Sequence, residues 1–467
     1  MWPRCLSQGK SIIVVRLFTV KALRRTLKIS GDPSTACLPP EAETPSNSTQ
    51  VQGVSMTTIE RRDLDTVDLA DPAVWDDGPP YELFAQLQRE SPVHFSPQRN
   101  LPGEGGFWSI TRYDDVRALS RDHRTFSSER RGIFHMDDIG VPLDLQRLQL
   151  ISMDPPRHDR LKALVIKEFT PEAVAAHENR VRQIINGVLD GVAGRERFDL
   201  VADVARPIPA RVIGSLLGTP PEDDAKLVHW TNVFTAFEDP AIREQWQDTM
   251  AVVGEITEYT QNRIAQRDDS IGGNLLTAMV DAEVEGDKLN ELEIATFFVL
   301  LMSAGNDSTR ATYSATMLEI LRDPQLRQLL RRHPELIPAA VEEGLRCYPA
   351  FSFMARAATK DTELHGQPIK ENDRLLLWYI ASNRDESVFP NPHTFDITRS
   401  GLADQHQAFG GRGRHFCLGA NLARLELKLW IQQTLERFPD LELDGEPTRV
   451  RALFLNQYNS VPVRRTS

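Results

Sequence analysis

The stretch Phe409–Arg424, with the sequence FGGRGRHFCLGANLAR, contains a single cysteine, Cys417, behind a run of glycines and basic residues. A strongly helical pattern, LGANLARLELKLWIQQTLERF, begins directly after it, so the thiol stands at or just before a helix N-terminus. Exposed N–H groups and the positive end of the helix dipole favour a thiolate there. A thiolate beside cations and close-approaching backbone suits an iron porphyrin, whose iron binds sulfur and whose propionates bind cations.

Three other interpretations of Cys417 are open from the residues alone. A lone cysteine is often a small packing residue, although a core thiol gains nothing from the neighbouring Arg412, Arg414 and His415. A catalytic thiol needs a base on another element, and His415 is too close in sequence to serve easily. A zinc site needs about four ligands, and no second Cys or His pair with suitable spacing stands near Cys417.

The loop resembles the heme-ligand loop of the cytochrome P450 family. Its aromatic residue, Phe409, stands one place earlier than the family pattern has it, because Gly410 occupies the usual position. The resemblance implies a mainly α fold with small β-sheets (α+β), in which a long central helix crosses the heme. It also implies that Cys417 is the ligand of the heme iron and that its neighbours bind the cofactor, namely Phe409, Gly413, His415 and Gly419.

The segment Asn290–Arg322 is the longest periodic stretch of the chain and predicts a helix. Asn290 is a good N-cap and Glu293 completes a capping box. The part TFFVLLMSA is apolar all round, which predicts a buried helix. The following AGNDST, residues 304–309, contains mostly poor helix formers, and such a conflict with local propensity tends to mark a functional site.

The buried Asp307 needs a partner, because an unpaired carboxylate in a core is costly. From the residues alone, a kinked helix with Asp307 paired to Arg310 is one solution. AGNDST also resembles the oxygen-binding motif of the family. That resemblance implies that Ala304 and Gly305 lie at the cofactor, that Asp307 relays protons from solvent, and that Ser308 supplies the assisting alcohol, a task that Thr309 shares.

Further cofactor-binding and anchoring residues follow from the resemblance. His158 and Lys162 lie on one helix face, which by itself is typical of a solvated basic surface. The resemblance implies instead that they bind the heme propionates together with Arg356. Glu343 and Arg346 form an i,i+3 pair that alone is an ordinary surface pair. In the family this pair is a buried anchor with a third partner, for which Arg399 is the candidate while the choice of arginine stays open.

Aromatic residues predict an apolar substrate pocket, although aromatics at helical spacing are more often plain core. The candidates are Phe134, Phe234, Phe237, Phe298, Phe351, Phe353 and Phe454. The chain resembles bacterial members acting on terpenoids, branched lipids or steroids. The implied activity is a monooxygenase that inserts one atom of O2 into a C–H bond. A heme-thiolate sensor without oxygenation and a peroxide-dependent heme enzyme are the alternatives, but neither needs the acid–alcohol pair.

The implied cofactor is heme b, with O2 as co-substrate and electrons that originate from NAD(P)H. The chain has no flavin or iron–sulfur domain of its own, so a separate ferredoxin and ferredoxin reductase are expected as partners. Basic side chains around the cysteine loop are candidates for a ferredoxin-docking patch, with an ordinary solvated face as the alternative: Arg412, Arg414, Arg424 and Lys428.

Composition limits the other classes of function. The chain has 467 residues and a formal net charge of −12, which argues against general nucleic-acid binding. Four scattered cysteines fit a reducing compartment and a cytoplasmic monomer. Residues 1–55 are expected to be a disordered or wrongly assigned N-terminal extension, with a targeting segment as the alternative, and their apolar run SIIVVRLFTV is too short to span a membrane. Residues 56–467 are expected to form one domain.

Overall fold

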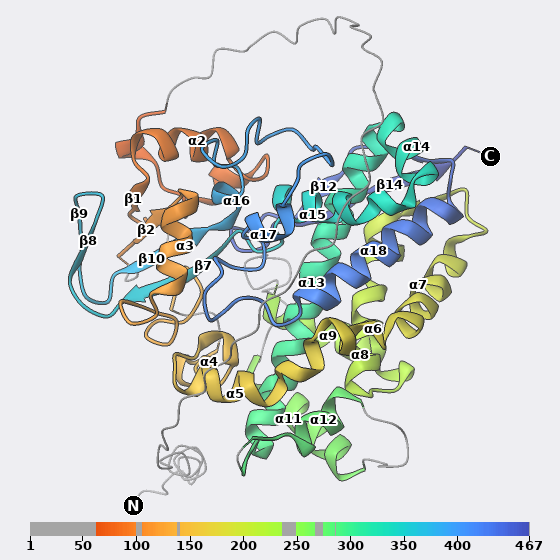
Figure 1. Ribbon diagram of the computed structural model, residues 1–467, viewed down its shortest axis with the longest axis horizontal. Coiled ribbons are helices and arrows are strands. Elements are labelled where there is room, and N and C mark those ends of the chain that lie inside the picture. The colour runs from red at the N-terminus through yellow and green to blue at the C-terminus, as the bar shows by residue number, and fades with distance from the viewer. Residues whose placement is uncertain are drawn as a thin grey trace, which may run out of the picture. The chain divides into compact units, whose positions relative to one another are not determined.

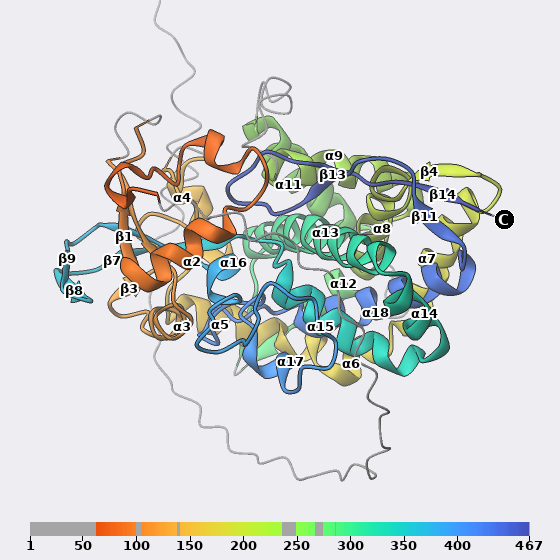
Figure 2. The same ribbon diagram turned by 90° about the horizontal axis from the view of Figure 1, so that it is seen from above.

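The long helix expected over Asn290–Arg322 is present as α13, Glu291–Arg322, in the computed structural model. The predicted capping box is confirmed, because the Asn290 side chain accepts from the Glu293 N–H and the Glu293 carboxylate accepts from the Asn290 N–H. The helix continues without a break through AGNDST. Figure 2 shows it running through the middle of the helical part. It packs most extensively against α8 (Pro207–Leu217), α9 (Asp224–Thr235), α11 (Thr249–Ala265) and α18 (Ala420–Arg437).

The structure describes residues 62–99, 105–137, 141–235, 249–266, 274–284 and 286–466, without the side chains of residues 231–250. All of them belong to one unit, Ile59–Ser467. The expected extension 1–55 lies outside the described residues, and the single domain over 56–467 stays a prediction. Within the described part of the chain, no helix has both the length and the apolar character needed to cross a membrane.

Helices dominate the described part. Besides the five already named, they are α2 (Tyr81–Glu90), α3 (Tyr113–Arg121), α4 (Leu143–Gln146), α5 (Arg157–Val165), α6 (Pro171–Ala175), α7 (Glu178–Val192), α12 (Leu275–Asp281), α14 (Pro324–Arg332), α15 (Ile337–Cys347), α16 (Tyr379–Ser382) and α17 (Leu402–Gln405). The sheets are small, so the predicted mainly α fold with small β-sheets is confirmed.

The largest sheet has five strands in the order β1-β2-β10-β7-β3, and Figure 1 shows it beside α2 and α3. Its strands are β1 (Val93–Ser96), β2 (Phe107–Ile110), β3 (Phe126–Ser127), β7 (Phe353–Ala358) and β10 (Arg374–Trp378). All neighbouring strands are antiparallel except β2 and β10. Because side chains alternate along a strand, β7 directs Met354 and Arg356 to one face and Phe353 and Ala355 to the other.

The other strands form a three-stranded sheet and three two-stranded hairpins. The sheet has the order β11 (Leu441–Leu443), β14 (Pro462–Arg465) and β4 (Arg197–Asp199). The hairpins pair β5 (Glu283–Val284) with β6 (Asp287–Lys288), β8 (Thr362–Leu364) with β9 (Gln367–Ile369), and β12 (Thr448–Arg449) with β13 (Tyr458–Ser460).

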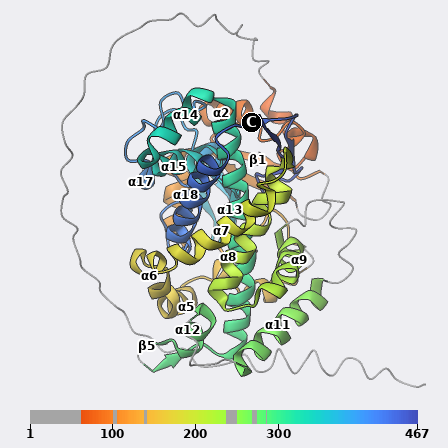
Figure 3. The same ribbon diagram turned by 90° about the vertical axis from the view of Figure 1, so that its right-hand side faces the viewer.

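Helix α18 lies beside α13 in the largest hydrophobic core (Figure 3). The Tyr313 ring stacks on Trp430 with a centroid distance of 3.6 Å, and the Tyr313 hydroxyl bonds to Thr434 Oγ1 at 2.8 Å. The same helix buries Glu426, whose Oε1 has no hydrogen-bond partner among the described residues. Burial raises the pKa of Glu426 from 4.5 to about 8.

Glu426 is therefore expected to make stability fall as pH rises. A pKa raised in the folded state means that the neutral acid stabilises the fold fully below pH 4.5, and that this contribution is lost as pH rises through about 8. Glu426→Gln should remove this pH dependence. The unfolding free energy of the variant, relative to that of the natural protein, should therefore rise by roughly 2–4 kcal/mol from about pH 4.5 to about pH 8. Urea unfolding of both proteins at the two pH values measures the difference. Parallel pH profiles would contradict this account of Glu426.

Candidate active site

The cysteine loop lies between α17 and α18. The backbone N–H of Cys417 donates to the carbonyl of Phe409 at 2.9 Å, so the loop folds back on itself at the thiol. Gly410, directly after Phe409, has φ +95°, a conformation that favours glycine. Helix α18 begins at Ala420, which confirms that Cys417 stands just before a helix N-terminus.

The glycines of the loop lie in two different environments. A Cβ on Gly413 would lie 1.8 Å from the backbone oxygen of Ser120 in α3, and one on Gly411 would lie 2.3 Å from the Ser120 hydroxyl. These two glycines are thus required by the packing of the loop on α3. A Cβ on Gly419 would meet no other protein atom within 4 Å. The protein itself gives no steric reason for glycine there, which fits close approach by a bound group.

Cys417 is accessible to solvent, although many protein atoms surround its thiol. Burial is the largest influence on the thiol and raises its pKa. The N–H of Gly419 and the charges of Lys162 and Arg424 lower the pKa. An accessible residue whose thiol is surrounded by protein atoms fits a recessed metal ligand. A set of three or more His, Cys, Asp or Glu side chains able to hold a metal ion is not found among the described residues.

Basic side chains from three elements gather near the loop. Arg356 on β7 is buried, and its Nη1 donates to the carbonyl of the neighbouring Ala355 at 2.7 Å. The rings of His158 and His415 lie 4.4 Å apart. Burial, followed by the charges of Arg356, His158 and Lys162, holds the pKa of His415 well below its ordinary value. No carboxylate among the described residues forms an ion pair with this buried arginine, which fits binding of an anionic group such as a heme propionate.

Lys162 contacts the cysteine loop directly. Its Nζ donates to the carbonyl of Arg414 at 2.6 Å and to that of Phe416 at 3.1 Å. The lysine thus joins α5 to the backbone immediately before Cys417. Ser128, which the sequence patterns did not indicate, bonds to His415, with 3.2 Å between its Oγ and the histidine Nε2.

One face of α13 remains partly accessible beside its buried faces. Leu301, Ala304, Gly305 and Ser308 are half-buried at helical spacing, whereas Asp307 and Thr309 are buried. Ser308 Oγ donates to the carbonyl of Ala304 at 2.6 Å, and Thr309 Oγ1 donates to that of Gly305 at 3.1 Å. The structure thus groups Ser308 with Ala304 and Gly305, and separates it from Thr309.

Asp307 has a partner on its own helix. Its Oδ1 lies 2.6 Å from Nη2 of Arg310, with the carboxylate 0% and the arginine 8% exposed. The same Nη2 donates to Gln457 Oε1 at 2.8 Å. The pairing of Asp307 with Arg310 that the residues alone allowed is therefore present, and it occurs in a continuous helix.

The expected anchor is buried and includes Arg399. Glu343 bonds to Arg346 through both carboxylate oxygens at 2.7 Å. Arg399 Nε reaches Glu343 Oε1 at 3.3 Å, so Arg399 is the arginine that joins the pair. Arg346 also donates to the carbonyls of Asn383, Pro392 and Thr394.

Four of the seven pocket candidates converge. Phe454 lies with its ring centroid 4.9 Å from Phe134, 5.0 Å from Phe351 and 5.4 Å from Phe353. Phe298 is apart from them: it is fully buried in the other core, with Tyr259 as its ring neighbour at 6.0 Å. The side chain of Phe234 and the whole of Phe237 lie outside the described residues.

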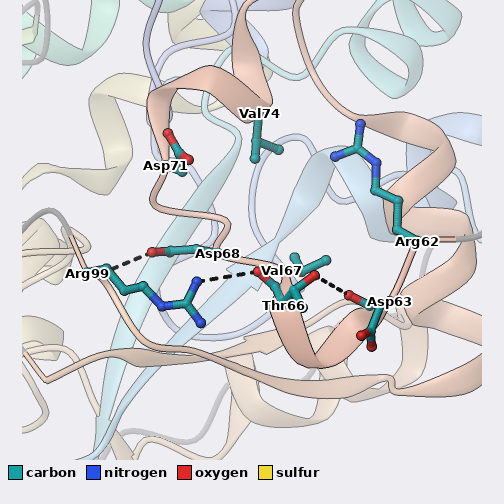
Figure 4. A pocket seen from close by; sticks show the side chains of 8 residues that line it. All are labelled: Arg62, Asp63, Thr66, Val67, Asp68, Asp71, Val74 and Arg99. Carbon is teal, nitrogen blue, oxygen red and sulfur yellow. Dashed lines mark hydrogen bonds between the residues drawn. The ribbon is translucent and has the colours of Figure 1, made fainter.

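Two clefts are formed by described residues. A shallow basic cleft of about 470 Å³ is lined by Arg121, His158, Asp159, Lys162, Arg412, Gly413 and Arg414. The other, of about 350 Å³, is lined by residues between Arg62 and Val74 and by Arg99 (Figure 4). Its acids bond to nearby backbone N–H groups, as Asp68 does to Arg99 and Ala70. It includes none of the site residues above.

Comparison with known proteins gives the family. Residues 224–451 match the cytochrome P450 family. A methyl-branched lipid omega-hydroxylase of Mycobacterium tuberculosis is 36% identical over 387 residues, which cover 81% of this chain and 90% of that protein. The chain belongs to the cytochrome P450 family. As a cytochrome P450 monooxygenase it uses heme and O2, with electrons from a redox partner.

Two further relatives extend the comparison of this cytochrome P450. The linalool 8-monooxygenase of Pseudomonas putida is 31% identical over 407 residues, or 86% of this chain and 99% of that protein. The crystal structure of a Mycobacterium marinum cytochrome P450 in complex with pseudoionone has a TM-score of 0.77 and 33% identity, covering 87% of this chain and all of that one. The P450 fold and the monooxygenase class expected from the sequence are thus confirmed.

Proposed function

We propose that this cytochrome P450 hydroxylates a C–H bond of an apolar small molecule of the terpenoid, branched-lipid or steroid type. The observation that supports it most is the aromatic cluster around Phe454. Met354, which shares a face of β7 with Arg356, the proposed cofactor-binding arginine, packs against the core that contains this cluster. An apolar pocket with few polar groups is typical of a site for such molecules. The named relatives, a lipid hydroxylase and a linalool monooxygenase, agree with this choice.

The proposed cofactor is heme b, with Cys417 as the iron ligand. The heme supplies the binding and reductive splitting of dioxygen, and the protein holds and orients it. Arg356, His158 and His415 are proposed to bind its propionates, since they bring basic groups together at a buried position. Lys162 is proposed to act there mainly by holding the loop carbonyls. Phe409, Gly413 and Gly419 are proposed to shape the loop around the cofactor.

Asp307 and Ser308 are proposed to deliver protons. Ser308 is half-buried on the same face of α13 as Ala304 and Gly305, and its hydroxyl donates a hydrogen bond to the Ala304 carbonyl. Asp307 is buried and bound to Arg310, so it exchanges protons only when that ion pair opens. Arg310 and Gln457 are therefore part of the proposed relay, as residues that hold the acid.

Ser308→Ala is expected to lower the product formed per electron consumed by about tenfold to a hundredfold, because the positioned hydroxyl is lost. Thr309→Ala should have a much smaller effect, since Thr309 lies off the accessible face. Ser303→Ala is the matched control, as its hydroxyl also bonds back within α13, to Val299 O. Product yield against NADH consumption measures all three. Equal losses in Ser308→Ala and Ser303→Ala would contradict the role of Ser308.

The substrate proposal is tested with a panel. A terpenoid, a branched fatty acid and a steroid are compared with a polar aromatic compound and a macrolide, first by the heme spectral shift on binding and then by product analysis. We expect shifts and hydroxylated products with at least one apolar class. Inert apolar compounds together with turnover of the polar aromatic or the macrolide would overturn the proposal. NADH consumption without any oxygenated product would favour the heme-thiolate sensor.

A ferredoxin and its NAD(P)H-dependent reductase are proposed as electron donors to a cytoplasmic, monomeric enzyme. The basic cleft is the proposed docking surface, with Arg412 and Arg414 among its lining residues. Arg424 is not included, because it does not line the cleft and its guanidinium bonds to Glu342. Arg414 also pairs with a carboxylate, Asp159, but that carboxylate lies in the cleft itself and the arginine is 49% exposed.

Arg414→Glu is expected to weaken ferredoxin binding about tenfold at low salt and to reduce the salt dependence, because a charge is reversed at the cleft. Arg451→Glu is the matched control: it reverses an exposed arginine that pairs with Asp76 and does not line the cleft. Titration calorimetry at two salt concentrations measures both variants. The same loss of affinity in both would assign the effect to net charge.

A further inference from the structure

Glu342, the residue before the anchor Glu343, contacts one residue on each side of the cysteine loop, His406 before it and Arg424 after it. Its Oε1 accepts from Arg424 Nε at 2.6 Å, and its Oε2 accepts from Arg424 Nη2 at 3.1 Å. Oε2 also lies 2.9 Å from Nε2 of His406. His406 precedes the cysteine loop and Arg424 follows it on α18, so one carboxylate on α15 joins the two flanks.

The two partners of Glu342 both contact Phe409. The guanidinium carbon of Arg424 lies 4.7 Å from the centre of the Phe409 ring, and the His406 ring lies 5.7 Å from it. The carbonyl of Phe409 accepts the N–H of Cys417. A continuous set of contacts therefore leads from Glu342 through Phe409 to the backbone of the cysteine.

These groups are well placed to act on the sulfur electrostatically. Burial alone would raise the pKa of Glu342, but the bonds from His406 and Arg424 lower it to about 2, so Glu342 is ionised throughout the working range. Arg424 is a cation held at the ring of Phe409, and the carbonyl of Phe409 accepts the N–H of Cys417. Glu342 thus both holds Arg424 in place and offsets part of its charge.

We propose that Glu342 is a positioning residue for the Cys417 thiolate, fixing Arg424 and His406 against Phe409 and thereby setting the charge and backbone geometry around the sulfur. This inference rests on the proposed ligation of heme by Cys417. It assigns to Arg424 a role inside the protein, at the ring of Phe409, in place of a surface role in docking.

The test uses the full-length holoenzyme and its midpoint reduction potential. In Glu342→Gln the positive charge of Arg424 is no longer offset. The uncompensated positive charge stabilises the reduced form of the site, because that form carries one more negative charge. The ratio of reduced to oxidised protein at a fixed solution potential should rise about threefold, or roughly 28 mV for a one-electron couple. In Arg424→Gln the carboxylate is left without its cation, so the ratio should fall by a similar factor. Glu342→Asp keeps the charge and should restore most of the natural value.

Asp404→Asn is the matched control. Asp404 pairs with Arg412, whose guanidinium carbon lies 5.0 Å from the ring of Phe416 in the same loop, but the aspartate is exposed. Its replacement should leave the potential and the carbon monoxide band unchanged. Opposite shifts in Glu342→Gln and Arg424→Gln support the proposal, even if one of them also unfolds more easily.

Two results would overturn the proposal. Variants with reduced unfolding stability but with unchanged potential and unchanged carbon monoxide band would show that Glu342 only stabilises the fold. Shifts of the same sign in both variants would show a general loss of loop structure. Failure of the proposed function is seen separately, because the natural protein would then lack the carbon monoxide band of a thiolate-bound heme.

Discussion

Cys417→Ser is expected to abolish turnover, reducing the rate by at least about a thousandfold, or about 4 kcal/mol in the activation barrier. Serine preserves the size of the side chain and the loop hydrogen bond of the backbone, but it does not supply a thiolate that donates charge to iron. The carbon monoxide difference spectrum of the reduced protein should lose the long-wavelength band of thiolate-bound heme at the same time. Heme content, measured separately, distinguishes loss of the ligand from loss of the cofactor.

Cys347→Ser is the control for that experiment. Cys347 is the other cysteine of the described residues, and it is buried with its sulfur 2.9 Å from Nη2 of Arg346. Burial raises its pKa to about 12, so it is a neutral thiol. The control variant should keep the band. A Cys417→Ser protein that hydroxylated its substrate at the natural rate would remove the basis of the proposed function.

Glu343→Gln is expected to cost about 3–5 kcal/mol of unfolding free energy, because it breaks a buried ion pair and leaves the partner charge uncompensated. Both Glu343 and Arg346 are 0% exposed, and Arg399 loses the same carboxylate. The variant should also retain less heme, since the segment that holds Arg399 continues directly into the cysteine loop. Urea unfolding and the heme-to-protein ratio measure the two effects.

Glu335→Gln is a suitable comparison for Glu343→Gln. Glu335 forms an exposed pair with His333 just before α15. Such an exposed pair contributes little to stability, so its loss should be barely measurable. A similarly small loss in Glu343→Gln would mean that the anchor is not important for stability.

Local signals predicted the parts of the fold that depend on neighbours in sequence. The capping box of Asn290 and Glu293 and the helix start behind Cys417 were predictable because each involves residues within one turn. The contact of Arg399 with Glu343 was not predictable from such local signals. The two residues are 56 positions apart, and Arg399 lies in the irregular segment between α16 and α17. The sequence offered several arginines for that place, and only the path of the loop selects one.

Side-chain direction explains the other differences. The segment TFFVLLMSA is apolar all round, so its pattern does not show which face meets the pocket, and Phe298 points into the core at Tyr259. Likewise, the EE of EEGLRC gives no sign that two adjacent carboxylates serve different partners. Because successive helical residues point about 100° apart, Glu343 faces Arg346 while Glu342 faces α18. The partners of Glu342, His406 and Arg424, come from distant parts of the chain, so the local sequence did not indicate them.

The close approach of Gly413 to Ser120 has a mechanical consequence. The end of α3 and the cysteine loop touch backbone to backbone, with no side chain between them to absorb a displacement. Arg121 and Gly413, one from each, line the same basic cleft. A protein that docked at this cleft would contact the backbone that leads to Cys417, the proposed metal ligand. Binding of the proposed electron donor would then be transmitted to the sulfur through a rigid backbone contact.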